Sequence, residues 1–285
     1  MSLRVTAMLG SALVQDLGRP GRSEIGVSPS GVFDRRAARQ ANALVGNAPG
    51  AAVLEVVGAL SLRASRETAV VVAGAPGPLT IDGVPASSLR LLRVPAGGVL
   101  SVGPAVVGLR RVVAFAGGIA TDPVLGSRST DTLAGLGPAP LEIGSPVVVA
   151  PGPVGPDRRQ LDTGVWGVGD LTVRVVLGPR DDWFSADAAD TLLRTGWTVS
   201  DRSDRIGLRL DGPPLERAVA GELESEAVVR GSIQVTSAGL PVVLGPDHPA
   251  TGGYPVIGVV VDADTDLLAQ AAPGRILRFR RHPAP

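Results

Sequence analysis

The chain has 285 residues, and its 27 basic residues are all arginines that balance 27 aspartates and glutamates. A formal charge of zero gives no net field to attract nucleic acid or an anionic membrane. Without cysteine there can be no disulfide, thiolate nucleophile or thiolate metal site, and without lysine there can be no Schiff base, P-loop lysine or biotinyl lysine on this chain. The two histidines, His248 and His282, are too few for a His-rich metal site, so we expect no metal.

The N-terminal residues 1–5 alternate like a strand and lack the apolar run of a signal peptide. No apolar stretch reaches the ~18 residues that a membrane helix requires. We therefore expect a cytoplasmic protein. Hydrophobic residues make up 44% of the chain but aromatic residues only 3%, so its core should be aliphatic.

Most apolar segments are short, rich in β-branched residues and bounded by glycine or proline, which predicts strands. In chain order they cover residues 53–57, 69–73, 89–94, 110–116, 146–150, 171–177, 206–210, 256–261 and 276–280. Three segments have a helical pattern: 32–45, capped by Ser30 and ended by Gly46; 186–194, capped by Ser185; and 265–270. Parallel βαβ units would need a helix between most strands, so the sequence predicts a mainly β fold with a few short helices, either a barrel or a sandwich.

Residues 151–169 are dense in proline and glycine and lie between strand patterns. They predict a linker between an N-terminal β-rich half, residues 1–150, and a C-terminal β-rich half, residues 170–285. The alternative is a long surface loop within a single domain.

The densest group of residues that could bind a ligand or take part in catalysis lies between Gln15 and Asp34. Arg19 could grip a carboxylate or phosphate through two parallel hydrogen bonds, and the backbone around Ser30 and Gly31 could hold an anion at a helix N-terminus. Asp16 and Asp34 are candidate bases. The alternative is a rigid turn in which Asp16 pairs with Arg19 and Asp34 supports the helix dipole.

Three further segments lie in the second half of the chain. Residues 200–210 contain two Asp–Arg pairs before a strand, and Arg205 belongs to one of these pairs. The segment could contribute to a functional site, or it could simply be the solvated edge of a hairpin. Glu222, Glu224 and Glu226 alternate, so on a strand they would share one face and could raise a pKa or bind a cation, although an ordinary wet face is more common. Residues 247–255 include Gly252, Gly253 and the single tyrosine, Tyr254, which could form the wall of a pocket or a simple turn.

Taken together, these motifs resemble the family of the 5-oxoprolinase C subunit, also known as allophanate hydrolase subunit 2, which is related to the carboxyltransferase part of urea carboxylase. The resemblance extends over residues 5–279. It rests on the motifs Val14-Gln15-Asp16-Leu17-Gly18-Arg19-Pro20-Gly21, Ser30-Gly31-Val32-Phe33-Asp34, Ala41-Asn42-Ala43-Leu44-Val45-Gly46-Asn47, Asp182-Trp183-Phe184, residues 203–210, residues 222–226 and Thr251-Gly252-Gly253-Tyr254-Pro255. The chain departs from the family at Ala250, where a second threonine is usual, and at Asp247-His248-Pro249.

The resemblance implies a cyclophilin-like β-barrel architecture and a hetero-oligomer with a small cyclophilin-like subunit and a larger lactam-hydrolase subunit. It also implies a hydrolase function, the ATP-dependent opening of 5-oxoproline to glutamate by the complex. In that reading Asp16, Asp34 and Glu226 are catalytic, while Arg19, Ser30, Gly31, Arg205, Gly252, Gly253 and Tyr254 bind substrate. The alternatives are a biotin-dependent carboxyltransferase subunit, with the biotin on another chain, and a regulatory binding module.

Overall fold

The computed structural model describes residues 2–156, 169–221 and 223–283. Their contacts divide the chain into two compact units. The N-terminal unit comprises the described residues of Met1–Arg19, Ser30–Asp131 and Gly135–Trp166, and the C-terminal unit those of Pro20–Pro29, Thr132–Ala134 and Gly167–Pro285. Two short segments of the first half of the sequence are therefore part of the C-terminal unit. Residues 157–168 of the predicted linker lie outside the described residues.

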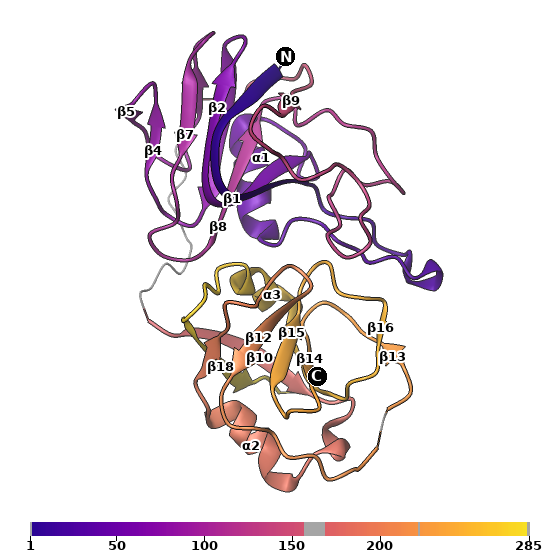
Figure 1. Cartoon of the computed structure of the whole chain (residues 1–285). Helices are drawn as coiled ribbons and strands as arrows, with labels where there is room; N and C mark the ends of the chain where they lie inside the picture. The colour runs from indigo at the N-terminus through magenta and orange to yellow at the C-terminus, as the bar shows by residue number, and fades with distance from the viewer. Residues whose placement is uncertain (1, 157–168, 222, 284–285) are drawn as a thin grey trace. The chain divides into compact units, whose positions relative to one another are not determined.

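A curved antiparallel sheet forms the N-terminal unit (Figure 1). Seven of its described strands follow the order β5-β4-β7-β2-β8-β3-β6, and β1 pairs with β2 and with β9. The strands are β1 (Ser2–Gln15), β2 (Val53–Ala64), β3 (Thr68–Gly74), β4 (Leu79–Ile81), β5 (Val84–Pro85), β6 (Leu92–Val94), β7 (Val99–Val102), β8 (Arg110–Phe115) and β9 (Pro146–Val148).

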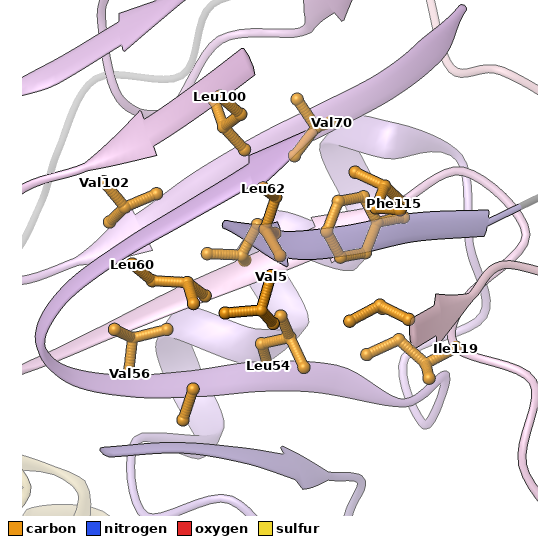
Figure 2. Close-up of a cluster of buried hydrophobic side chains, with 14 of the residues drawn as sticks. Val5, Leu54, Val56, Leu60, Leu62, Val70, Leu100, Val102, Phe115 and Ile119 are labelled. Carbon is orange, nitrogen blue, oxygen red and sulfur yellow. The ribbon is translucent and has the colours of Figure 1, made fainter. Parts of the chain in front are cut away.

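Both faces of β3 and β8 are buried, which explains why these two strands read as continuous apolar runs rather than as an alternation. Val70 and Phe115 point into a cluster of aliphatic side chains on one face, which Figure 2 shows together with Leu54 and Val56. Val71 points to the other face, where it packs in the cluster that contains the apolar side of α1 (Arg35–Val45).

The helix α1 begins later than the sequence predicted. Asp34, not Ser30, is its N-cap residue, and the Asp34 carboxylate accepts a hydrogen bond of 2.8 Å from the backbone N–H of Ala37. Ser30 cannot serve as the cap because it lies four residues upstream, with φ at 51°. The predicted end at Gly46 is confirmed, since this glycine adopts a left-handed conformation with φ at 93°.

Within the described residues of the C-terminal unit, a seven-stranded barrel closes in the order β10-β17-β14-β15-β12-β11-β18. Its strands are β10 (Leu171–Leu177), β11 (Trp197–Val199), β12 (Gly207–Asp211), β14 (Ser232–Val235), β15 (Pro241–Leu244), β17 (Val256–Val260) and β18 (Ile276–Arg281). A separate pair joins β13 (Glu226–Ala227) to β16 (Thr251–Gly252). The predicted mainly β fold is confirmed.

Two α-helices and two single-turn 3-10 helices, at Ser23–Ile25 and Asp181–Trp183, complete the described part of this unit. The helix α2 (Ala186–Arg194) has the predicted bounds, although the side chain of Ser185 makes no capping hydrogen bond. The helix α3 (Asp262–Leu268) begins three residues earlier than predicted. No helix in the described residues is long and apolar enough to span a membrane.

Candidate functional site

Asp16 follows the end of β1 and is almost fully buried, with 8% of its surface exposed. Its carboxylate accepts hydrogen bonds from the backbone N–H groups of Gly18 (2.8 Å) and Arg128 (2.6 Å). The hydroxyls of Ser127 (2.6 Å) and Ser129 (2.7 Å) also donate to it. Four donors leave little room for the proton of a substrate or a water molecule. The geometry therefore favours a structural role, in which Asp16 holds the loop of residues 127–129 against β1.

Arg19 is also buried, with only 1% of its surface exposed, whereas the sequence suggested an accessible loop arginine. Its guanidinium donates to the backbone carbonyls of Ser129 and Val124, and Nη1 lies 3.6 Å from a carboxylate oxygen of Asp131. The predicted pairing with Asp16 is wrong, because the acidic partner is Asp131. The guanidinium of Arg19 therefore binds groups of its own unit, and its burial keeps it from a ligand in solvent.

The backbone at Ser30 and Gly31 passes very close to the end of β1. A Cβ atom at Gly31, where φ is 94°, would lie 2.9 Å from the backbone nitrogen of Gly18, so only glycine fits here. The hydroxyl of Ser30 donates to the carbonyl of Thr130 (3.1 Å). Both residues are buried and join neighbouring loops within the N-terminal unit.

The backbone N–H groups that follow Gly31, predicted to bind a substrate anion, already have internal acceptors. The N–H of Val32 donates to the carbonyl of Asp16 (2.8 Å), and that of Phe33 donates to the carboxylate of Glu55 (2.6 Å). An acidic residue of the protein itself therefore occupies the predicted anion position.

Glu55 is part of a buried arrangement that sequence reasoning missed. Its carboxylate lies 3.4 Å from Nε of Arg110, whose guanidinium sits 4.3 Å from the centre of the Phe33 ring. The one signal in the sequence was a single acidic residue inside the apolar strand of residues 53–57. A charge at such a position needs a partner because burial of an unpaired charge is costly.

The two asparagines of residues 41–47 have structural contacts as well. Asn42 donates to the carbonyl of Ala51 (2.8 Å), and Asn47 donates to the side chain of Asn42 (2.9 Å) and to the carbonyl of Phe115 (2.8 Å). These bonds tie the end of α1 to the neighbouring strands.

In the C-terminal unit, Arg205 forms a buried two-pronged ion pair with Asp247, with two N–O distances of 2.9 Å. Both the backbone N–H and the hydroxyl of Thr132 donate to the same carboxylate. Burial acts to raise the pKa of Asp247, but the charge of Arg205 and these hydrogen bonds outweigh it, so the pKa lies below its ordinary value. This pair also has the character of a structural anchor.

Glu226 and Tyr254 belong to a different environment. Glu226 lies opposite Gly252 in the β13–β16 pair, and its carboxylate receives the guanidinium of Arg180 from both Nε and Nη2. Hydrogen bonds from Arg180 lower the pKa of Glu226. The side chains of Arg180 and Glu226 are 37% and 32% exposed, and Tyr254 is 45% exposed. This group is reachable from solvent.

The backbone of this region is fixed from within the barrel. Nε2 of Gln234, a buried residue on β14, donates to the carbonyl of Tyr254 (3.2 Å). A side chain at Gly252 would have to displace the amide group of Gln234, because a Cβ atom there would meet Nε2 of Gln234. Gly253 is exposed beside it. The predicted residues Glu226, Gly252, Gly253 and Tyr254 are thus brought together, and Arg180 is the member that the sequence analysis missed.

The predicted face of alternating glutamates is wrong as a strand feature, since β13 begins only at Glu226. Glu224 is exposed ahead of the strand, and Glu222 lies outside the described residues. An adjacent arginine, rather than a like charge, dominates the environment of Glu226. Among the described residues, no three acidic or histidine side chains gather closely enough to hold a metal ion.

The chain is similar to known proteins over most of its length. The pattern of the family described as "Carboxyltransferase domain, subdomain A and B" matches residues 25–281. The C subunit of the Escherichia coli (strain K12) 5-oxoprolinase is 34% identical over 274 residues, which cover 93% of this chain and 86% of that protein. The chain belongs to this carboxyltransferase-domain family. These relatives are enzyme subunits or domains of larger enzymes.

Two larger proteins share the same domain. The urea amidolyase of Lachancea kluyveri is 29% identical over 98% of this chain, which spans 17% of that protein. The crystal structure of the K. lactis urea amidolyase superposes with a TM-score of 0.94 at 27% identity, covering 99% of this chain and 19% of that one. The same domain therefore makes up most of a subunit in one relative and a small part of a much longer chain in others.

Proposed function

We propose that this protein is a subunit of an ATP-dependent 5-oxoprolinase, which opens 5-oxoproline to glutamate together with partner subunits. The observation that carries this proposal is the match with the C subunit of a bacterial 5-oxoprolinase, which covers 93% of this chain and 86% of the relative. The match with urea amidolyase covers only 17% of that much longer protein. We assign the chain an activity within the complex rather than alone.

The residues that the sequence assigned to substrate anions do not fit a nucleotide. Arg19 is committed to Asp131 and Arg205 to Asp247, and the chain has no lysine to neutralise phosphate. We therefore assign ATP to a partner subunit. A covalently attached biotin would likewise have to be carried by another chain.

The group of this chain best placed to bind the substrate is Arg180. A lactam such as 5-oxoproline carries a carboxylate, and a partly exposed guanidinium is suited to bind it through two hydrogen bonds. Glu226 holds Arg180, and Tyr254, which is 45% exposed, follows the strand β16 that pairs with Glu226. We propose that Arg180 receives the substrate carboxylate, while Tyr254 and the backbone at Gly252 and Gly253 border the same ligand.

In this proposal Glu226 acts as a positioning residue rather than as the general base suggested by the sequence. Its pKa is lowered by Arg180, so the carboxylate is ionised at neutral pH and is a weak proton acceptor. Its contacts orient the guanidinium. Asp16 and Asp34 are committed to the loop of residues 127–129 and to the start of α1, which leaves the proton-transfer step to a partner subunit.

The direct test is to reconstitute the complex from this chain and the subunits encoded beside it. The release of ADP and glutamate from 5-oxoproline should require every subunit, and omission of this chain should abolish glutamate formation. Full activity without this chain would refute the proposal.

The likeness to urea amidolyase and the name of the family support a second candidate, a biotin-dependent carboxyltransferase subunit. In that case the protein should transfer the carboxyl group of a carboxylated biotin carrier to an amide acceptor. A reconstituted complex that consumes carboxybiotin and leaves 5-oxoproline intact would favour this candidate over the first.

A further inference from the structure

The middle of β1 is an exposed, uncharged strand edge. Residues 5–15 contain no charged side chain, and Leu9 is 73% exposed. On one side β1 pairs with β2 along almost its entire length, from Leu3 to Gln15. On the other side β9 pairs only with Ser2, Leu3 and Arg4.

Loop contacts bracket the open stretch without covering it. The carbonyl of Val5 accepts from Gly144, and the carbonyl of Ala12 accepts from Leu141. Residues 141–144 therefore take a short path between these two points, while residues 6–11 arch away from it. The curve is possible because Gly10 and Gly58 face one another with positive φ, and a Cβ atom at Gly10 would lie 2.2 Å from the carbonyl oxygen of Val57.

The alternation of the ladder identifies the free backbone groups. The carbonyls of Ala12 and Val14 point away from β2, toward Leu141 and Thr130. In an antiparallel ladder every second residue points the same way, so the N–H and C=O groups of Met8 and Gly10 also point outward. Within the described part of the chain, no strand pairing or backbone hydrogen bond from a loop reaches Met8 or Gly10 from that side.

The other edges of this sheet are protected. The outer strand β5 has two residues and ends in Pro85, and β9 begins with Pro146. The outer strand β6 has three residues, including the charged Arg93. Short strands, prolines and charges are the usual means by which proteins prevent edge-to-edge pairing. Between Met8 and Gly10, the long strand β1 contains neither a proline nor a charged residue.

We propose that this edge pairs with the same edge of a second copy of the chain, in an antiparallel fashion about a two-fold axis. Because the middle of β1 is uncharged, two copies of it can lie side by side without repulsion between like charges. A single contact about a two-fold axis covers the open β1 edge of both copies. Centred on Leu9, the pairing sets Met8 opposite Gly10 of the second copy and lets them exchange backbone hydrogen bonds. The two Leu9 side chains then face each other, and the exposed Ile143 lies on the adjoining loop.

Sedimentation velocity over a range of protein concentrations tests this proposal. The unmodified chain should show a concentration-dependent dimer, and Leu9→Lys should weaken it at least tenfold because two ammonium groups would meet at the axis. Val84→Lys is the matched control, since Val84 is 66% exposed on the protected β5 edge of the same sheet. This variant should dimerise like the parent chain.

Amide hydrogen exchange of the unmodified chain provides a second readout that does not depend on the folding of a variant. Exchange at Met8 and Gly10 should slow as the protein concentration rises, while exchange at β5 should not change. A chain that stays monomeric, a dimer that Leu9→Lys leaves intact, or an equal loss in both lysine variants would overturn the proposal. So would protection of Met8 and Gly10 only when a different subunit is added.

Discussion

The two units each hold an arginine beside an acidic residue among the candidate site residues, but the two pairs differ in accessibility. In the N-terminal unit, Arg19 and Asp131 are fully buried and are tied to neighbouring backbone. In the C-terminal unit, Arg180 and Glu226 are about one third exposed. The buried pair is part of the packed interior, whereas the second pair can be reached from solvent. The presence of charged residues in a family motif does not by itself distinguish these roles.

The largest effect is expected for Asp16→Ala. It removes an acceptor that binds four donors and leaves those donors buried, which should cost about 3 kcal/mol or more of unfolding free energy. Urea denaturation followed by fluorescence and circular dichroism measures this loss. Asp201→Ala, at an exposed position, is the control and should change stability by less than about 0.5 kcal/mol. A small loss for Asp16→Ala would show that the buried network is not needed for the fold.

Arg19→Lys should come next. Lysine keeps the charge but cannot reach Val124, Ser129 and Asp131 at once, and a buried ion pair that loses its geometry should cost about 3 kcal/mol. The melting temperature should therefore fall together with activity. An unchanged melting temperature would contradict the structural role of this arginine.

Arg180→Lys should have the opposite profile. If Arg180 binds the substrate carboxylate, turnover of the assembled enzyme should fall about tenfold or more, which corresponds to ~1.4 kcal/mol. Stability should change little, because solvent screens partly exposed ion pairs. Arg194→Lys is the matched control, since Arg194 forms an exposed pair with Asp190 on α2. Equal activity in the two variants would remove Arg180 from the site.

The smallest expected effect is a difference in stability between variants that appears only at acidic pH. The lowered pKa of Asp247 means that its contribution to stability is complete above its unfolded pKa of ~3.9 and is lost as the pH falls through the lower folded value. The contribution of Asp247 to the free energy of unfolding should thus stay constant from pH 7 to 5 and decline below about pH 4. Asp247→Asn should flatten that decline, while Glu226→Gln should leave most of it, as measured by denaturation at a series of pH values.

Much of the fold could be predicted from local patterns. Apolar β-branched runs located the strands β2, β3, β8, β10 and β17, and the helical pattern placed α2 with its observed bounds. The start of α1 was missed because Ser30 and Asp34 are both good cap residues, and only the contacts of Ser30 with Thr130 and of Asp34 with Ala37 distinguish them. Local sequence carries no information about such a choice.

The candidate site was less predictable for a related reason. The partners that decide the roles of Asp16, Arg19 and Glu226 are far away in the sequence, at residues 127–129, 131 and 180. Sequence patterns singled out these charged residues, but burial and long-range pairing determine whether such residues support the fold or face a ligand. Arg180 was overlooked because it stands in a loop without a motif of its own.

The most direct test of the difference between the two units is a parallel measurement on Arg19→Lys and Arg180→Lys in the reconstituted enzyme. For each variant, the melting temperature of this chain and the rate of glutamate release from 5-oxoproline are determined on the same preparation. We expect Arg19→Lys to lower both quantities, and Arg180→Lys to lower turnover while the melting temperature stays within about 2 °C of the parent. An Arg19→Lys variant that keeps its melting temperature but loses turnover would contradict the account.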